Sequence, residues 1–169
     1  GVDLTTGSLG QGVSTATGAA LGNRIDGRDN TVYCVIGDGE ADEGQVWEAF
    51  HFAYAHKLDN IIYFIDNNGY QLDGSTADIL AHPNMAKKVE GFGLHTQEVD
   101  GHDVDAIYKA IILAKSAKGV PSCIVLNTSK GKGATFAEVN HEHSSQPKEE
   151  QWQEAIAAAE KALEAEKNA

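Results

Sequence analysis

The stretch that decides the fold is "TVYCVIGDGEADEG", from Thr31 to Gly44. Its first six residues are β-branched or apolar, which is the composition of a buried strand. Gly37, Asp38 and Gly39 follow at once, so a carboxylate stands in a turn between two glycines. Gly37 is expected to let the backbone turn, and Gly39 to let a backbone N–H approach a phosphate without a Cβ in the way. In an open parallel sheet, ligands bind beyond the carboxyl ends of the strands, where helix N-termini converge. The stretch therefore predicts a strand that carries a binding turn at its carboxyl end.

Further runs of the same kind occur along the chain. "NIIYFID" covers residues 60–66, "PSCIVLNT" covers 121–128, and a less regular run covers 94–99. The runs at 31–36, 60–66 and 121–128 are continuously apolar, which predicts strands covered on both faces of a parallel sheet. Helical spacing of apolar residues fills the intervals at 10–23, 41–58 and 103–118. Because strands and helices alternate, we expect an α/β layered sheet with right-handed crossovers.

The length and the tail of the chain bear on its domain organisation. A chain of 169 residues is enough for one domain with a substantial core and too short for two ordinary ones. We therefore expect a single domain over residues 1–169. Residues 148–169 read as an amphipathic charged helix with Trp152, Ile156 and Leu163 turned inward, which predicts a C-terminal helix that packs on this domain.

Composition excludes several classes of function. The net charge of −12 repels phosphate backbones and anionic lipid, so we expect neither a nucleic-acid nor a membrane partner. No run approaches the roughly 20 apolar residues of a membrane span. The two cysteines, Cys34 and Cys123, lie in apolar runs and are expected to be core thiols in a reducing compartment. These features favour the cytoplasm.

A divalent cation explains a carboxylate in the turn at Asp38. Mg²⁺ held by one or two protein oxygens can bridge to the phosphates of a ligand. A second ligand is expected at the end of a neighbouring strand. Asn68 follows Asp38 by 30 residues, about one strand-helix-strand unit. If the two strands are adjacent, Asp38 and Asn68 lie side by side.

The motifs together resemble one family. The segments "TTGSLGQG", "GDGEADEGQVWEA", "IDNNGYQLDG", "VDGHD" and "TSKGKG" occur in this order and are similar to transketolase, in particular its N-terminal, pyrophosphate-binding section, which some microbes encode separately. The resemblance covers Asp3 to about Trp152. It implies a three-layer α/β sandwich with a mostly parallel central sheet, the thiamine-diphosphate-binding fold. It also implies thiamine diphosphate and Mg²⁺ or Ca²⁺ as cofactors.

The resemblance implies a role for residues near the strand ends. Asp38, the side chain of Asn68 and the backbone carbonyl of Tyr70 would hold the metal against the diphosphate. Gly39 would donate its backbone N–H to a phosphate oxygen. Leu72 would lie beside the thiazolium ring, although it reads almost as well as a plain core residue.

Other implied contacts are spread along the chain. Gly7 and Leu9 would line the cofactor, and Lys130 would pair with its diphosphate. Glu43 would lie near the interface between two halves of an active site, and the resemblance gives it and His143 catalytic roles. A solvated acid and a surface lysine are the alternative readings of Glu43 and Lys130. His143 would also contact the cofactor, as the histidine of the family's Trp-His-Gly segment does. That segment is replaced here by Glu142-His143-Ser144, so the nearby His141 competes with His143.

As a member of this family, the chain would take part in a transketolase reaction of the pentose phosphate pathway. Such a reaction transfers a two-carbon ketol unit from a ketose phosphate to an aldose phosphate. The family's activating glutamate belongs to a pyrimidine-binding domain that has no counterpart in this sequence, and family histidines that grip the sugar lie upstream of "GVDLTTG". We therefore expect a domain that lacks its N-terminal part. It would be inactive without a pyrimidine-binding partner, with which it forms a dimer or heterotetramer.

Three alternatives remain open at this point. The first is another thiamine-diphosphate enzyme, such as a deoxyxylulose-phosphate synthase or a phosphoketolase. The second is a truncated, non-catalytic module that binds the cofactor and serves assembly. The third is dinucleotide binding, but the glycines of "GSLGQG" run in the wrong order for the G-x-G-x-x-G fingerprint.

Overall fold

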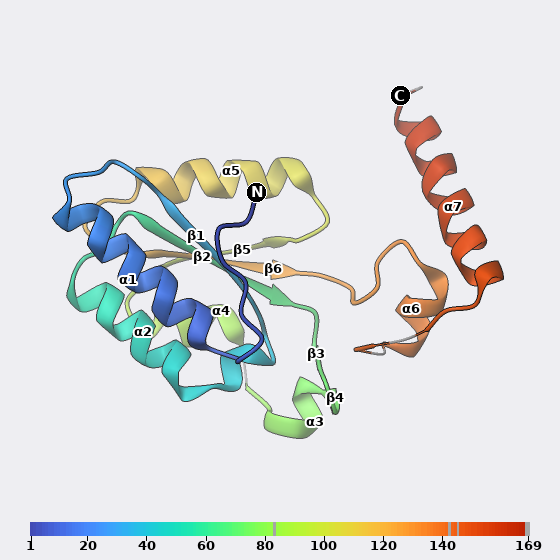
Figure 1. Cartoon of the computed structure of the whole chain (residues 1–169), viewed down its shortest axis with the longest axis horizontal. Coiled ribbons are helices and arrows are strands. Elements are labelled where there is room, and N and C mark those ends of the chain that lie inside the picture. Colours follow the sequence, from blue (N-terminus) through green and yellow to red (C-terminus); the bar gives the residue numbers. More distant parts are fainter. Residues whose placement is uncertain (83, 142, 145, 168–169) are drawn as a thin grey trace. The chain divides into compact units, whose positions relative to one another are not determined.

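The computed structural model describes residues 1–82, 84–141, 143–144 and 146–167. The chain forms two compact units, Gly1–Thr128 and Ser129–Ala169. The first contains the predicted sheet, and the second contains the loop "SKGKG" and the C-terminal helices (Figure 1). The predicted helix 148–169 corresponds to α7, Glu149–Lys167, and residues 168–169 lie outside the described residues. That α7 packs on the sheet-containing unit stays a prediction.

The first unit is built on a four-stranded sheet. Its strands are β1 (Val32–Gly37), β2 (Ile61–Asn67), β5 (His95–Asp100) and β6 (Ser122–Asn127), in the spatial order β1-β2-β6-β5. Every neighbouring pair is parallel. The predicted α/β class with a parallel central sheet is confirmed, and all four predicted strands are present.

Helices cover both faces of this sheet (Figure 1). One face carries α1 (Gln11–Ile25), α2 (Gly44–Ala55) and α4 (Met85–Glu90), and the other carries α5 (Val104–Ser116). Asp103 caps α5 by accepting a hydrogen bond from the Ala106 amide at 2.9 Å, as the sequence predicted. The unit is therefore a three-layer sandwich.

Alternating residues of β2 supply both cores. Ile61, Tyr63 and Ile65 pack in the larger cluster, with α1, α2 and α4, whereas Ile62 and Phe64 pack in the smaller one, with α5. Side chains of a strand point to opposite faces in turn, so a strand in mid-sheet must be apolar at every position. The buried hydroxyl of Tyr63 lies 2.7 Å from Thr17 Oγ1, which satisfies the polar group in the core.

The prediction of burial on both faces is right for β2 and β6 and wrong for β1. Cys34 and Ile36 are buried, but Tyr33 is 49% exposed and Val35 is 70% exposed. The reason is position: β1 is an edge strand, and α5 packs mainly against β5 and β6. A continuous apolar run in the sequence therefore does not distinguish an edge strand from a strand in the middle of the sheet.

Short elements around the strand ends were not predicted. The 3₁₀ turn η1 (Glu40–Asp42) precedes α2, so the predicted helix 41–58 begins later than expected. Beyond β2 the chain forms a small antiparallel hairpin, β3 (Tyr70–Gln71) with β4 (Gly74–Ser75), followed by α3 (Thr76–Leu80). Of these elements, η1 and the hairpin lie beside the predicted binding turn.

The second unit has its own contacts. It contains α6 (Thr135–Asn140) and α7. The rings of Phe136 and Trp152 meet edge to face, with centroids 5.8 Å apart. Over the described residues of the whole chain, no helix combines the length and the apolar character that crossing a bilayer needs.

Neither cysteine should react while the chain is folded. Cys34 is 8% exposed and Cys123 is fully buried. Burial, assisted by the charge of Glu40, raises the pKa of the Cys34 thiol to about 11, and burial also raises the pKa of Cys123. Thiolate is the reactive form, so we expect a colorimetric thiol reagent at pH 8 to titrate no thiol in the native chain and two in guanidinium. Rapid labelling without denaturant would contradict this packing.

Candidate functional site

The glycine-flanked carboxylate lies at the carboxyl edge of the sheet. Gly37, the last residue of β1, pairs in register with Asp66 of β2, and Asp38 follows it with 1% of its surface exposed. One carboxylate oxygen of Asp38 accepts from the Gly39 amide at 2.9 Å. The other accepts from the Gly69 amide at 2.7 Å. Two neighbouring strand ends therefore meet at Asp38, as the sequence predicted.

Burial and nearby groups shift the titration of Asp38 in opposite directions. Burial raises the pKa of its carboxyl group above the usual value, and the nearby charge of Asp66 raises it further. The hydrogen bonds from Gly69 and Gly39 act in the opposite direction and lower this pKa. A bound cation would favour the ionised carboxylate in the same way.

Asn68 lies in the same network at the end of β2. Its Nδ2 donates to Asp66 Oδ2 at 3.2 Å, and its Oδ1 accepts from the Tyr70 amide at 3.0 Å. The hydroxyl of Thr128 donates a short hydrogen bond to Asp66 Oδ1. An amide oxygen has two lone pairs, so Oδ1 of Asn68 keeps one for a further ligand.

Sequence reasoning missed Asp66, Gly69 and Thr128. Asp66 orients the Asn68 side chain, and Gly69, with φ of +78°, turns its amide to Asp38. Only part of this was visible in the sequence: "DNNG" ends a strand with an acid, two amides and a glycine, which is typical of a turn. Nothing in the sequence indicated that Thr128, which follows β6, would reach Asp66.

The two glycines of the triplet differ in their surroundings. A Cβ at Gly39 would lie 2.6 Å from Gln71 Cβ, so the hairpin β3-β4 leaves no room for one. Gly39 has φ of −65°, which any residue adopts, so the close approach is what requires glycine. Gly37 has neither a positive φ nor any atom within 4 Å of a Cβ among the described residues. The expectation that Gly37 is needed for the turn is not supported.

The remaining predicted contacts in the first unit are accessible. Tyr70 is partly buried at the start of β3, and Leu72, in the hairpin turn, is 70% exposed, so it is not a core residue. Gly7 is exposed and Leu9 is 52% exposed, in the loop before α1. Glu43 is exposed at the N-cap of α2 and makes no side-chain capping bond.

Lys130 and the two candidate histidines belong to the second unit. Lys130 is partly buried and precedes Gly131, whose φ of +78° and tight contact with Ala137 shape the loop. His143 is exposed, and His141 ends α6 in a left-handed conformation with φ of +50°. The roles predicted for these residues toward the first unit stay predictions.

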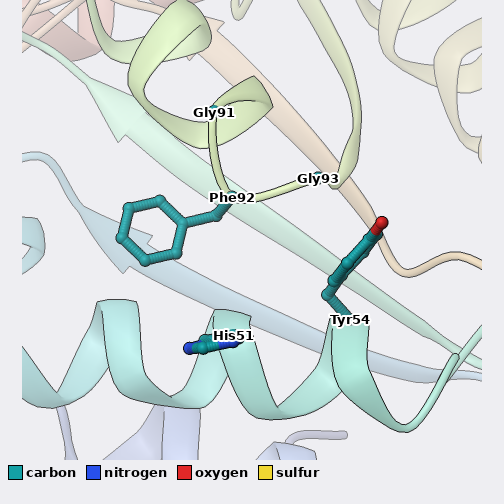
Figure 2. Close-up of a pocket in the computed structure, with 5 residues that line it drawn as sticks. All are labelled: His51, Tyr54, Gly91, Phe92 and Gly93. Atoms are coloured by element: carbon teal, nitrogen blue, oxygen red, sulfur yellow. The ribbon is translucent and has the colours of Figure 1, made fainter.

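A shallow open pocket lies elsewhere in the first unit. His51 and Tyr54 of α2 line it together with Gly91, Phe92 and Gly93, just before β5 (Figure 2). Because β5 begins and α2 ends nearby, the pocket is at the amino edge of the sheet, opposite Asp38. Ligands of parallel sheets bind at the carboxyl edge, so we assign this pocket no role.

Comparison with known proteins decides the family. The family model described as "Transketolase, thiamine diphosphate binding domain" matches residues 1–166. The chain belongs to this transketolase family. The resemblance that the sequence motifs indicated is thus confirmed, together with the fold and with thiamine diphosphate as the ligand of the family's domain.

Two curated relatives are named as transketolase subunits. The chain is 49% identical over 162 residues to the 6-deoxy-6-sulfo-D-fructose transketolase subunit of Clostridium sp., covering 95% of this chain and 59% of the relative. It is 39% identical over 149 residues to an apulose-4-phosphate transketolase subunit from Actinobacillus succinogenes, covering 88% and 54%. The chain therefore spans little more than half the length of these relatives.

Among solved structures, transketolase from Campylobacter jejuni is similar, with a TM-score of 0.77 and 34% identity. The similarity covers 83% of this chain and 23% of that one.

The donor groups around Asp38 suit a hard divalent cation. A carboxylate, a neutral amide oxygen and a backbone carbonyl are the ligands that Mg²⁺ and Ca²⁺ prefer. Burial and the nearby charge of Asp66 raise the pKa of the Asp38 carboxyl group, and a bound cation would favour its ionised form. Among the described residues, no group of three or more His, Cys, Asp or Glu could hold a metal. The ligands proposed for the metal, which are Asp38, the Asn68 side chain and the Tyr70 carbonyl, are not a group of that kind, because they include a single carboxylate.

Proposed function

We propose that this chain is the pyrophosphate- and metal-binding part of a transketolase that transfers a two-carbon ketol unit from a ketose phosphate to an aldose phosphate. One observation carries the proposal: Asp38 is buried at the carboxyl edge, hydrogen-bonded to the amides of Gly39 and Gly69 next to Asn68. Membership of the family and the names of the relatives support it.

In this proposal the turn and the hairpin hold the cofactor. Asp38, the Asn68 side chain and the Tyr70 carbonyl would bind Mg²⁺ or Ca²⁺, and the metal would neutralise the diphosphate. The Asn68 side chain is already oriented by Asp66 at 3.2 Å, which limits the reorganisation that binding requires. Thiamine diphosphate supplies the electron sink for breaking the carbon–carbon bond.

The other predicted residues would complete the site. Gly39 would donate to a phosphate oxygen, and Lys130 would add the cation that an acidic chain needs beside a diphosphate. Gly7, Leu9 and Leu72 would contact the rings of the cofactor, which fits the exposure of both leucines. Glu43 and His143 would act near the reacting atoms, with Glu43 facing the paired active-site half.

We further propose a pyrimidine-binding partner, in a dimer or heterotetramer. Relatives named as subunits support a second polypeptide. One of them is named for a sulfonated sugar and the other for a sugar phosphate, so a test of the reaction needs a donor of each kind.

Calorimetric titration tests the cofactor assignment. We expect saturable binding of thiamine diphosphate with Mg²⁺, loss of that binding in EDTA, and no binding of NAD, because the glycines of "GSLGQG" run in the wrong order for the dinucleotide fingerprint. Binding of NAD without thiamine diphosphate would refute the proposal.

A transfer assay tests the reaction itself. The chain is mixed with a polypeptide that carries a transketolase pyrimidine-binding domain, thiamine diphosphate, Mg²⁺ and an aldose phosphate as acceptor. Either a ketose phosphate or 6-deoxy-6-sulfo-D-fructose is offered as donor. Transfer only in the mixture supports the proposed division of the site. Cofactor binding without transfer from either donor would favour the non-catalytic module.

A further inference from the structure

The side chains of Glu40 and Gln45 both hydrogen-bond to the Leu9–Gly10 peptide unit, in the loop before α1. The amide of Gly10 donates to Glu40 Oε1 at 2.8 Å. The carbonyl of Leu9 accepts from Gln45 Nε2 at 3.1 Å. These two backbone atoms belong to the same peptide unit, so its donor and its acceptor are both held by residues at least 30 positions away.

The geometry of Gly10 makes this contact specific. Gly10 is buried and is the N-cap residue of α1, with φ of +82°. A Cβ there would lie 2.7 Å from Gln45 Cγ, so the Gln45 side chain packs directly on the glycine. The Glu40 carboxylate is at the N-terminus of α1, where the helix dipole favours a negative charge.

The residues that hold the loop are themselves fixed to the glycine turn. Glu40 follows Gly39 directly and begins η1. The indole Nε1 of Trp47 donates to the Ala41 carbonyl at 2.7 Å, and its ring packs on Phe50 and Phe92 with centroids 5.5 and 5.1 Å away. The turn around Asp38 and the loop before α1 are therefore joined through side chains of η1 and α2.

We propose that Glu40 and Gln45 are positioning residues that fix the Leu9–Gly10 peptide relative to the diphosphate turn, so that the loop is already in place when thiamine diphosphate binds. This inference rests on the proposed function. Neither side chain is among the residues proposed to touch the cofactor. Each acts through the loop that carries Gly7 and Leu9, which would contact the rings rather than the diphosphate.

Comparing the binding of two ligands distinguishes the positioning role of Glu40 and Gln45 from a general loss of structure. In the proposed function, thiamine diphosphate with Mg²⁺ uses the loop as well as the residues that hold the metal and the diphosphate, whereas inorganic pyrophosphate with Mg²⁺ uses those residues but not the loop. We expect Glu40→Ala to weaken thiamine diphosphate binding about tenfold, as loss of a hydrogen bond to a charged group does, and to leave pyrophosphate binding within about twofold. Glu40→Gln, whose amide oxygen can still accept from Gly10, should recover most of the affinity.

Gln45 offers a second variant of equal size. Gln45→Glu replaces the donor to the Leu9 carbonyl by an acceptor, so it should weaken thiamine diphosphate binding as Glu40→Ala does. Asp29→Ala is the matched control for charge, because Asp29 is exposed in the loop before β1. It should change neither affinity.

Hydrogen exchange at residues 6–11 reports on the loop without any ligand. We expect the Gly10 amide to exchange faster in Glu40→Ala than in the wild type and to be protected again in Glu40→Gln. Unchanged exchange, unchanged thiamine diphosphate affinity, or an equal loss of pyrophosphate binding would each overturn the positioning role. A wild-type chain that binds no thiamine diphosphate would instead overturn the proposed function, and this inference with it.

Discussion

Replacing Asp38 by alanine should abolish Mg²⁺-dependent binding of thiamine diphosphate. Changes to partners that only orient a metal ligand cost about 10- to 100-fold in affinity, so loss of the proposed carboxylate ligand should cost more than about 100-fold. The variant in Mg²⁺ should behave as the wild type does in EDTA. Calorimetric titration with thiamine diphosphate, with and without Mg²⁺, measures both.

The same substitution should leave the chain folded. Removing the carboxylate leaves the amides of Gly39 and Gly69 without their acceptor, at a cost of about 1–3 kcal/mol for each buried donor. Part of that cost is offset, because the raised pKa of Asp38 means that its ionised form is less favourable in the folded chain than in the unfolded chain. For such an acid, the contribution to stability is fully present below the unfolded pKa and is lost as the pH rises through the folded pKa. In EDTA, the gap in unfolding free energy between wild type and variant should therefore narrow from acid pH toward neutral.

Asp29→Ala serves as control here also, since it removes one exposed carboxylate from the same chain. Urea unfolding followed by circular dichroism establishes that Asp38→Ala is folded. A folded Asp38→Ala chain that keeps its Mg²⁺-dependent affinity would remove Asp38 from the metal site.

The sequence alone predicted that the ends of two strands, distant from each other along the chain, lie together. Continuous apolar runs located the strands, and the spacing of 30 residues between Asp38 and Asn68 predicted adjacent parallel strands. Both are local or near-local signals, because a strand-helix-strand unit fixes which strand ends come together. The pairing of Gly37 with Asp66 confirms this reasoning. The chemical roles of Asp38 and Asn68 stay predictions.

Features that depend on the order of strands could not be predicted from local patterns. β1 and β2 are equally apolar in sequence, yet Val35 is 70% exposed and Phe64 is buried, because one strand is at the edge and the other is inside. Likewise, nothing in the sequence distinguishes Glu40 from the neighbouring acids Asp42 and Glu43. Its hydrogen bond to Gly10 depends on how α1 packs beside η1, and residue type does not encode that.

Gly39 shows a different limit of sequence reasoning. Glycine after Asp38 was expected so that a backbone amide could approach a phosphate. The structure supplies another reason, since a Cβ would meet Gln71 of the hairpin. The residue type was interpreted correctly as a sign of close approach, but the neighbour could be found only in three dimensions.

Gly39→Ala should therefore weaken the cofactor site by displacing the hairpin. The new Cβ would lie 2.6 Å from Gln71 Cβ and 3.4 Å from its Cα, and the first contact is with an atom next to the backbone that cannot rotate away. Overpacking of this kind costs about 1–3 kcal/mol. Because Gln71 follows Tyr70, whose carbonyl is a proposed metal ligand, we expect at least about a tenfold loss of Mg²⁺-dependent thiamine diphosphate affinity.

A second substitution shows whether the clash is the cause. Gln71→Gly in the Gly39→Ala background removes the opposing Cβ and leaves the Gln71 Cα at an ordinary contact distance, so it should restore much of the affinity relative to Gln71→Gly alone. Gly37→Ala is the matched control for stability, since open space surrounds Gly37, and its melting temperature should stay close to that of the wild type. If Gly39→Ala were as stable and bound as tightly as the wild type, the hairpin would not be held against the turn. If the double variant showed no recovery over Gly39→Ala, contact with Gln71 would not be the reason that position 39 is glycine.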